Sequence, residues 1–429
     1  MKIVFVETPS PWLVRSDAII SLGMLYLATV LHNAGYDAQL ARPHAVEDFK
    51  EFYDADVICL GGTTLEYPMT IKCAKWVREH LPKAKLLFGG THATAMLQDV
   101  LDEDLFDAVC AGEGESIIVE IINDIENGCL RKVYRAGEYI KDLDTIPFPD
   151  RSLVKDAYGK GLFSHGEEYI GDKSESLMTS RGCPFNCAFC ASKSMWHWGV
   201  RYRSANNVAD EVEYIIDTMG IKQFGMWDDN LTANKRRCFE LCDRLAEYDI
   251  AWKGLARAAD LTPEICEALA RAHCKEVGLG FESGDQRVLD FLDKHTTTEI
   301  MATGCKNAKA AGLKVRGLFM IGTPGERADT PELNMEYMNE LDPDMVSLSL
   351  FTPLPGSPIW NDPDKYNCEI LTKDFTKYNE YCYVMDDGKK VRQDFEPLIH
   401  NKFLTIDQMQ DNIRRMMDYH ESAERCNRG

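Results

Sequence analysis

Continuous apolar runs alternate with helical segments along most of this chain, and this alternation limits the possible fold more than any other feature. A strand that is apolar throughout is buried on both faces, as in parallel sheets wound with helices. The sequence therefore predicts an α/β domain over residues 1–135. Its expected strands lie at KIVFV, VICLGG, KLLFGG and AVCAGEGE, with helices at Leu22–Asn33, Pro68–Leu81 and Ser116–Asn127.

The same rhythm resumes at Ser176 and continues through about six strand-helix units, beginning with the strand SLMTS. Six such units predict a partial (β/α)6 barrel of the TIM type over residues 176–360, with its chemistry at the C-terminal ends of the strands. Residues 136–175 are expected to form a linker, in which Pro147 and Pro149 favour extended chain. Residues 361–429 are expected to form a small helical extension that caps the barrel.

Composition excludes several classes of function. The net charge of −21 disfavours nucleic acid as a partner, because such partners need a basic surface. Apolar runs fall short of the roughly 18 residues that a membrane span needs. We therefore expect a cytoplasmic protein, in which 15 cysteines point to metal or redox use rather than to disulfides.

Three of these cysteines form a compact motif directly after the strand SLMTS. Cys183, Cys187 and Cys190 have the spacing C-x3-C-x2-C, which predicts a metal centre. A [4Fe–4S] cluster normally takes four cysteines, so three would leave one iron open to a ligand. The alternatives are a zinc knuckle completed by His197, or unrelated core thiols. Cys238 and Cys242 are four residues apart in an expected helix, where burial of one face explains them.

The motif with its aromatic residue, C-x3-C-x-Phe-C, resembles the signature of the radical S-adenosylmethionine (radical SAM) superfamily. The sequence on either side resembles the cobalamin (B12)-binding subgroup of that superfamily. The resemblance extends from Met1 to about Trp360. It rests on the segments SLGMLYLATVLHNAGY, GGTHAT, GEGES, IPFPDRS, RGCPFNCAFC, RYRS, MWDDN, FESG, FMIGTPGE and PLPGSP.

This resemblance implies a Rossmann-like cobalamin-binding domain, a radical SAM barrel, and three cofactors: a [4Fe–4S] cluster, S-adenosylmethionine and cobalamin. The open iron would bind S-adenosylmethionine, whose cleavage yields a 5′-deoxyadenosyl radical that takes hydrogen from an unactivated carbon. The expected function is C-methylation, with methylcobalamin as the methyl donor. The alternative is a non-methylating reaction of the same family: dehydration, cyclisation, ring contraction or rearrangement, with or without bound cobalamin. A non-catalytic sensor of iron or cobalamin is a third hypothesis. The expected partners are a small molecule or short peptide as substrate and a one-electron reductant such as flavodoxin or ferredoxin.

In the barrel, the resemblance implies roles for residues at the ends of strands. Phe189 would flank the adenine, and Trp227, Asp228 and Asp229 follow the second strand, where one aspartate would pair with an ammonium group. The alternative is that an aspartate caps the helix that begins near Asn234. Arg257 would bind a carboxylate and Glu282 a ribose hydroxyl, unless these two residues form a buried ion pair.

In the N-terminal domain, the glycine-rich loops after successive strands are the expected cobalamin contacts, because ligands of open α/β sheets bind at this edge. The loops also suit tight turns without a ligand. The chain lacks the Asp-x-His-x-x-Gly motif whose histidine ligates cobalt in other cobalamin proteins. His92 then suits loop packing or a corrin amide contact. The expected contacts are Thr63, Thr64, Leu65, Gly89, Gly90, His92, Glu113 and Gly114.

Overall fold

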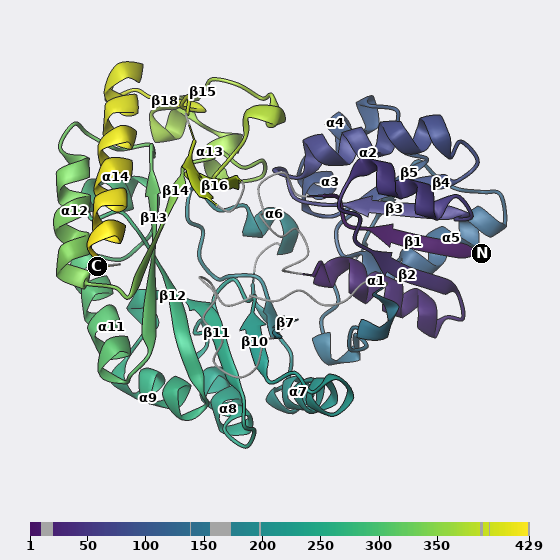
Figure 1. Cartoon of the computed structure of the whole chain (residues 1–429), viewed down its shortest axis with the longest axis horizontal. Coiled ribbons are helices and arrows are strands. Elements are labelled where there is room, and N and C mark those ends of the chain that lie inside the picture. The colour runs from purple at the N-terminus through teal and green to yellow at the C-terminus, as the bar shows by residue number, and fades with distance from the viewer. Residues whose placement is uncertain are drawn as a thin grey trace. The chain divides into compact units, whose positions relative to one another are not determined.

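The computed structural model describes residues 1–9, 20–137, 139–154, 173–196, 199–386, 389–393 and 395–427. These residues form two compact units (Figure 1). The first unit contains residues 1–154 with 194–196 and 201–203, and the second contains residues 173–193, 199–200 and 204–427. Each unit is described by itself below.

The first unit is built on a parallel sheet of six described strands in the order β2-β1-β3-β4-β5-β6. The strand order reverses between β1 and β3, which is the point where ligands bind in open α/β sheets. The predicted α/β class is confirmed. The strands are β1 (Lys2–Val6), β2 (Asp37–Ala41), β3 (Val57–Gly61), β4 (Lys85–Gly89), β5 (Ala108–Ala111) and β6 (Val133–Arg135).

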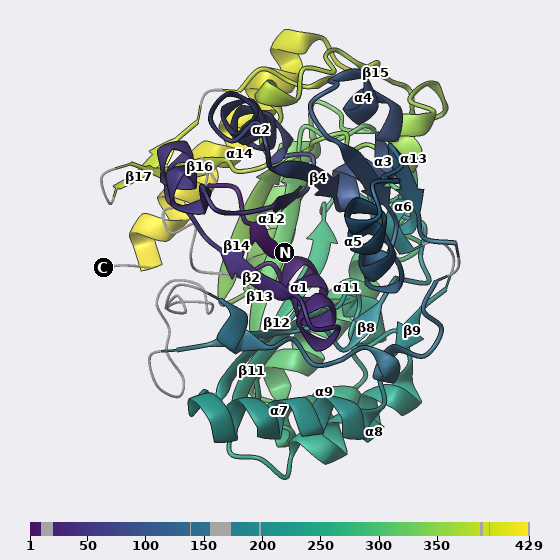
Figure 2. The same ribbon diagram turned by 90° about the vertical axis from the view of Figure 1, so that its right-hand side faces the viewer.

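Helices cover both faces of this sheet, with α1 and α5 in contact with each other and α2 against β3 (Figures 1 and 2). The core strands are apolar because both faces are covered: Ile3, Val4 and Val6 are fully buried. The helices are α1 (Leu22–Asn33), α2 (Tyr67–His80), α3 (Thr91–Ala95), α4 (Leu97–Asp102) and α5 (Ile118–Glu126), with short 3₁₀ turns η1 (Val46–Phe52), η2 (Gly114–Ser116), η3 (Leu143–Thr145) and η4 (Arg151–Leu153). The short strand β9 (Arg201–Tyr202) also belongs to this unit.

The second unit contains another parallel sheet, in the order β14-β13-β12-β11-β10-β7. Sequential strand order with a helix after each strand is the topology expected of an open (β/α)6 barrel. The helices lie outside the strands in Figure 1. The strands are β7 (Glu175–Leu177), β10 (Gln223–Met226), β11 (Ala251–Ala256), β12 (Cys274–Glu282), β13 (Lys314–Ile321) and β14 (Met345–Leu350).

Alternation along β13 separates the two faces of the barrel sheet. Val315, Phe319 and Ile321 are buried in the main core, whereas Arg316, Leu318 and Met320 are only half-buried. The outer face therefore carries the core beneath the helices, and the inner face keeps partial access to solvent. The helices are α6 (Ser192–Trp196, shared with the first unit), α7 (Ala205–Met219), α8 (Lys235–Leu245), α9 (Pro263–Arg271), α10 (Gln286–Phe291), α11 (Thr298–Ala310) and α12 (Thr330–Leu341), with η6 (Ala258–Asp260).

The strand expected at SLMTS is shorter than predicted. β7 ends at Leu177, and Ser180–Arg181 form a separate short strand, β8. The cause is Asp228, whose carboxylate accepts hydrogen bonds from Thr179 N (3.3 Å), Thr179 Oγ1 (2.8 Å) and Ser180 Oγ. These bonds hold the chain away from the barrel sheet directly before the cysteine motif.

The C-terminal extension ends in a helix, as expected, and it also contains short strands that the sequence analysis did not predict. Short strands of three or four residues give no clear apolar pattern in a sequence. The final helix packs against α12, β13 and β14, where Ile413, Met416 and Met417 join the main core. The elements are α13 (Pro358–Asn361), η7 (Asp364–Tyr366), β15 (Cys368–Ile370), η8 (Phe375–Lys377), β16 (Tyr383–Asp386), β17 (Lys389–Arg392), β18 (Ile399–Asn401) and α14 (Ile406–Asn427).

Across the described part of the chain, every helix is too short or too polar to cross a membrane.

Gly304 fixes the distance between α11 and the turn after β11. A Cβ atom at this position would lie 1.9 Å from the Ala258 carbonyl oxygen, so even alanine forces two backbone segments apart. Gly304→Ala is expected to destabilise the protein by about 1–3 kcal/mol, the usual cost of overpacking. Thermal unfolding measures this effect, with Gly312→Asn as the control at an open left-handed turn. Equal melting temperatures for Gly304→Ala and the wild type would contradict the close packing.

Candidate functional site

The three motif cysteines lie in one loop between β8 and α6. All three are half-buried, whereas most other described cysteines are fully buried in a core. Burial raises the pKa of each thiol, that of Cys190 to about 12, and Cys183 and Cys187 raise it further through their nearby charge. The three sulfur atoms are therefore close enough to act on one another while keeping access to a ligand.

The donor set fits an iron–sulfur cluster better than a single metal ion. Among the described residues, no group of three or more His, Cys, Asp and Glu side chains converges on one ion position. A cluster binds each thiolate to a different iron, so its ligands need not converge on one point. Two cations, Lys294 and Arg257, also lie near Cys187. Their charges offset part of the rise in the pKa of the Cys187 thiol that burial causes. His197, the fourth ligand of the zinc alternative, lies outside the described residues.

The two aspartates after β10 have different environments. Asp228 is 1% exposed, and its three hydrogen bonds to Thr179 and Ser180 make it a support of the cysteine loop. Asp229 is exposed, accepts a hydrogen bond from Ser192 Oγ (2.8 Å), and raises the pKa of both Cys183 and Cys190 by its charge. Asp229 is therefore the carboxylate of the pair that remains accessible beside the cysteines.

Neither aspartate caps helix α8. The Asn234 side chain performs this role by accepting from Arg237 N at 3.1 Å, so the capping alternative was wrong. Trp227 is half-buried, and its indole Nε1 donates to Ser176 Oγ at 3.1 Å. This bond joins β10 to β7 at the barrel edge.

Arg257 follows β11 and lies against the cysteine loop. Its guanidinium stacks 3.7 Å from the Phe185 ring centroid, and Nη2 donates to the Lys294 and His295 carbonyl oxygens. The buried Nε has no hydrogen-bond partner among the described residues. A buried donor is costly when unsatisfied, so this atom suits a ligand.

Glu282 does not pair with Arg257, so the expected alternative of an Arg257–Glu282 ion pair was wrong. Its partner is Lys294, with Nζ 2.6 Å from Oε1 and both side chains about 10% exposed. Glu282 also has a positive φ of 63° at a shift in the β12–β13 register. Gly280 leaves space for the pair, because a Cβ there would lie 2.4 Å from Glu282 Oε1.

Lys294 is a site residue that the sequence analysis missed. Its ammonium bonds Glu282, lies 5.7 Å from the Phe189 ring centroid, and lowers the pKa of Cys187. One cation thus connects the expected ribose contact, the expected adenine neighbour and a cysteine of the motif. It lies in a loop twelve positions after Glu282, and a loop lysine gives no pattern in a single sequence.

The loops after β3 and β4 support each other at the C-terminal edge of the first sheet. His92 N donates to the Gly62 carbonyl oxygen at 3.2 Å, and a Cβ on Gly90 would lie 3.1 Å from Gly62 N. Gly90 has a φ of 99°, which favours glycine. The glycines therefore let these two loops approach each other closely at this edge of the sheet.

The expected cobalamin contacts fall into two groups. Thr64, His92 and Glu113 are buried, whereas Thr63, Leu65, Gly89, Gly90 and Gly114 keep access to solvent.

His92 is part of the loop's core. Its Nδ1 lies 3.0 Å from Thr64 Oγ1, its ring stacks on Tyr67 at 3.9 Å, and burial lowers its pKa to about 4. The uncharged ring supports the loop after β3, which agrees with loop packing rather than with a cobalt ligand.

Glu113 anchors two other segments of the first unit. Its buried carboxylate accepts from Ile140 N (3.0 Å) and pairs with Arg201 Nη1 (2.8 Å). Arg201 also donates to the Ile140 carbonyl oxygen and lies over the Tyr139 ring. Glu113 therefore supports this edge of the first sheet by holding Ile140 and Arg201 in place.

Cys238 and Cys242 on α8 are both fully buried in the main core. This placement confirms the interpretation of these residues as core thiols.

Comparison with known proteins finds one family model that matches the barrel and another that matches the N-terminal domain. The Radical SAM superfamily model matches residues 177–338, and the B12 binding domain model matches residues 14–122. An uncharacterized methyltransferase of Pyrococcus horikoshii is 28% identical over 95% of this chain and 92% of its own length. The anaerobic magnesium-protoporphyrin IX monomethyl ester cyclase of Rubrivivax gelatinosus is 26% identical over 91% of this chain and 76% of its own.

Among solved structures, the radical S-adenosylmethionine methyltransferase TsrM from Kitasatospora setae, with cobalamin and a [4Fe–4S] cluster bound, matches with a TM-score of 0.67. It is 15% identical and covers 87% of this chain and 81% of its own, so the match establishes the fold. The chain is a radical SAM enzyme, whose cofactors are a [4Fe–4S] cluster, S-adenosylmethionine and cobalamin. Residues 177–338 are therefore a radical SAM domain and residues 14–122 a B12-binding domain, as the resemblance in the sequence implied.

Proposed function

We propose that this enzyme is a cobalamin-dependent C-methyltransferase that acts on an unactivated carbon. The observation that carries the proposal is that one chain contains both an accessible three-cysteine loop and an open parallel sheet in a region that matches the B12 binding domain. When bound, the cofactors supply a 5′-deoxyadenosyl radical and a transferable methyl group. A radical step followed by methyl transfer replaces one high activation barrier by two lower ones.

In this proposal the barrel residues hold S-adenosylmethionine against the cluster. Cys183, Cys187 and Cys190 bind three irons, and Asp229 is the accessible carboxylate for an ammonium group beside them. The unpartnered Nε of Arg257 donates to a carboxylate. Asp228 acts through its hydrogen bonds to the loop, so we assign it a positioning role and no contact with substrate.

Glu282 and Phe189 complete the cofactor site in this proposal. Glu282 accepts from a ribose hydroxyl with the oxygen that Lys294 leaves open. Phe189, held on one side by the Lys294 ammonium, flanks the adenine. Trp227 closes the barrel edge next to Asp229 and excludes water from the radical.

In the first unit, the proposed corrin contacts are the exposed loop positions Thr63, Leu65, Gly89, Gly90 and Gly114. Thr64, His92 and Glu113 act from beneath by fixing these loops. We further propose that cobalt receives no ligand from His92, because that ring is buried and stacked on Tyr67.

A second candidate, cyclisation without methyl transfer, is favoured by the match to the Rubrivivax gelatinosus cyclase. The proposed reductant is a flavodoxin or ferredoxin, and the proposed substrate is a small molecule or short peptide. We propose that the enzyme works in the cytoplasm, where the described free thiols stay reduced.

Product analysis separates the two candidates. The enzyme, reconstituted without oxygen with iron, sulfide and hydroxocobalamin, is incubated with S-adenosylmethionine and a one-electron reductant. A methyltransferase is expected to form both 5′-deoxyadenosine and S-adenosylhomocysteine, because one S-adenosylmethionine is cleaved and another donates methyl. Deoxyadenosine alone would favour the second candidate. Absence of both products, with iron bound, would overturn the proposed function.

A further inference from the structure

The turn Gly322–Glu326 follows β13 at the C-terminal edge of the barrel. Gly322 and Gly325 have φ values of 75° and 90°, and a Cβ on Gly325 would lie 2.8 Å from Phe291 Cβ. The Glu326 carboxylate is 3% exposed and accepts from Thr323 N (3.0 Å) and Thr323 Oγ1 (3.3 Å). The turn therefore has one tightly determined shape.

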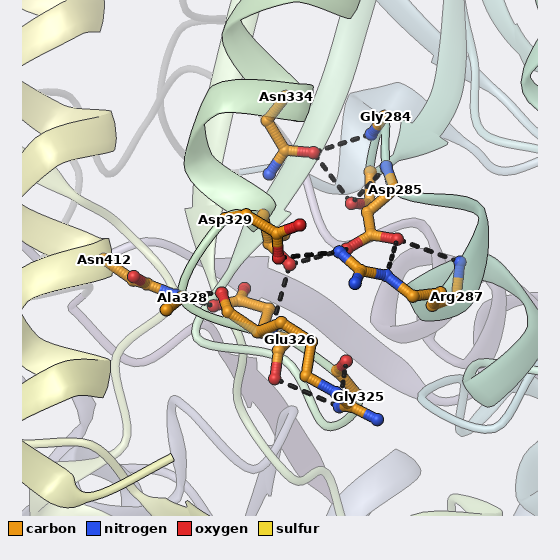
Figure 3. A network of polar contacts seen from close by, with 12 residues as sticks. Gly284, Asp285, Arg287, Gly325, Glu326, Ala328, Asp329, Asn334 and Asn412 are labelled. Carbon is orange, nitrogen blue, oxygen red and sulfur yellow. Dashed lines mark hydrogen bonds and ion pairs between the residues drawn. The ribbon is translucent and has the colours of Figure 1, made fainter. Parts of the chain in front are cut away.

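Two buried asparagines of the C-terminal extension hold this turn from outside. Asn401 Nδ2 donates to the Glu326 carbonyl oxygen at 2.9 Å and lies 3.4 Å from that of Thr323. Asn412 Nδ2 donates to the Arg327 carbonyl oxygen at 2.9 Å and lies 3.4 Å from Glu326 Oε2 (Figure 3). Because these amides bind backbone carbonyls, they fix the conformation of the turn.

The Glu326 carboxyl depends on these neutral donors. Its hydrogen-bond partners among the described residues are all uncharged, and burial raises its pKa to about 7. Loss of an amide donor would therefore leave buried oxygens unsatisfied, which costs more than the bond itself contributes.

Nearby bonds join the turn to the segment after Glu282. On α12, Asn334 Oδ1 accepts from Ser283 Oγ (2.7 Å) and Gly284 N (2.6 Å). Asp285 accepts from Thr330 Oγ1 at 2.6 Å (Figure 3). A displacement of the turn and of the start of α12 would thus reach the Glu282 segment.

The extension and the segment that leads into it also support the cysteine loop. Ile359 N donates to the Ala188 carbonyl oxygen at 3.0 Å, and Ala188 lies in a small core with Tyr366, Cys368 and Leu404. Tyr366 Oη donates to Asp293 Oδ2 at 3.0 Å, beside Lys294. The extension thus contacts the cysteine loop, the segment at Asp293 and the turn Gly322–Glu326.

We propose that Asn401 and Asn412 are positioning residues for S-adenosylmethionine, and that the C-terminal extension builds the cofactor site. This inference rests on the proposed function, because it takes the barrel edge to be the S-adenosylmethionine site. The sequence alone predicts a separate role for the extension, which is to cap the barrel mouth.

The test compares Asn401→Ala and Asn412→Asp with Gln410→Ala, an exposed position on α14, the helix that carries Asn412. Asn412→Asp keeps the side-chain shape and replaces the amide donor by a carboxyl oxygen beside the Glu326 carboxyl. Each reconstituted protein is assayed for iron content, for S-adenosylmethionine binding by equilibrium dialysis, and for the change that S-adenosylmethionine causes in the EPR spectrum of the reduced cluster.

We expect both asparagine variants to keep their iron and to bind S-adenosylmethionine about tenfold more weakly, the size of one lost buried hydrogen bond. The EPR change should need correspondingly more S-adenosylmethionine, while Gln410→Ala matches the wild type. Unchanged binding and spectra in both variants, even with lower melting temperatures, would overturn the positioning role alone. A wild-type protein that binds neither iron nor S-adenosylmethionine would overturn the proposed function as well.

Discussion

Replacing Cys187 with alanine is expected to abolish cluster binding. Iron should fall from about four atoms per chain to below one, because two remaining thiolates do not hold a [4Fe–4S] cluster. Formation of 5′-deoxyadenosine should disappear with the cluster. The fold should persist, since the Cys187 thiol is half-buried in a loop and belongs to neither hydrophobic core. Iron analysis after anaerobic reconstitution, with a far-UV circular dichroism spectrum, measures both effects.

The matched control is Cys238→Ala, which removes a thiol from the core of α8. This variant is expected to keep its iron and its deoxyadenosine formation, with a small loss of stability from the missing sulfur atom. The opposite result, in which Cys187→Ala keeps iron and Cys238→Ala loses it, would show that the cluster lies elsewhere.

Replacing Lys294 with methionine should destabilise the barrel strongly. The change leaves the Glu282 carboxylate buried without its cation, which costs about 3–5 kcal/mol. Removing both charges, in Glu282→Gln with Lys294→Met, should restore most of this stability because no charge is then left buried. Thermal or urea unfolding of the wild type, the two single variants and the double variant gives the coupling energy of the pair.

The Lys294 variants also separate stability from cofactor binding. The double variant should regain stability but still bind S-adenosylmethionine weakly, because Glu282, the proposed ribose contact, has been replaced. Additive effects of the two single changes on unfolding would contradict the buried pair.

The sequence predicts the elements well where burial determines them. The segment Leu22–Asn33 is predicted to be a helix and forms one, because its apolar residues are buried against the sheet of the first unit. The strand SLMTS was only partly right, since Asp228, 49 positions after Thr179, withdraws Thr179 and Ser180 from the barrel sheet. Such long-range polar contacts leave no local pattern.

The site shows the same division. Local spacing identified Cys183, Cys187 and Cys190. The contacts of Arg257 and Glu282 could not be predicted, because sequence periodicity does not show which residues pair across the fold. The Arg–Glu pair that strands β12 and β13 do form is Glu276 with Arg316, at 2.8 Å. Glu282 uses Lys294 from a loop, and Asn401 and Asn412 reach the turn at Glu326 from 75 and 86 positions away.

The most direct test of the central claim is the metal and corrin content of the purified chain. The protein is purified without oxygen, reconstituted with iron and sulfide in the presence of hydroxocobalamin, freed of unbound cofactor, and analysed for iron, cobalt and its visible spectrum. The account predicts about four iron atoms and one cobalt atom per chain. Iron without cobalt would contradict the cobalamin-dependent reaction, and a protein without iron would contradict radical chemistry altogether.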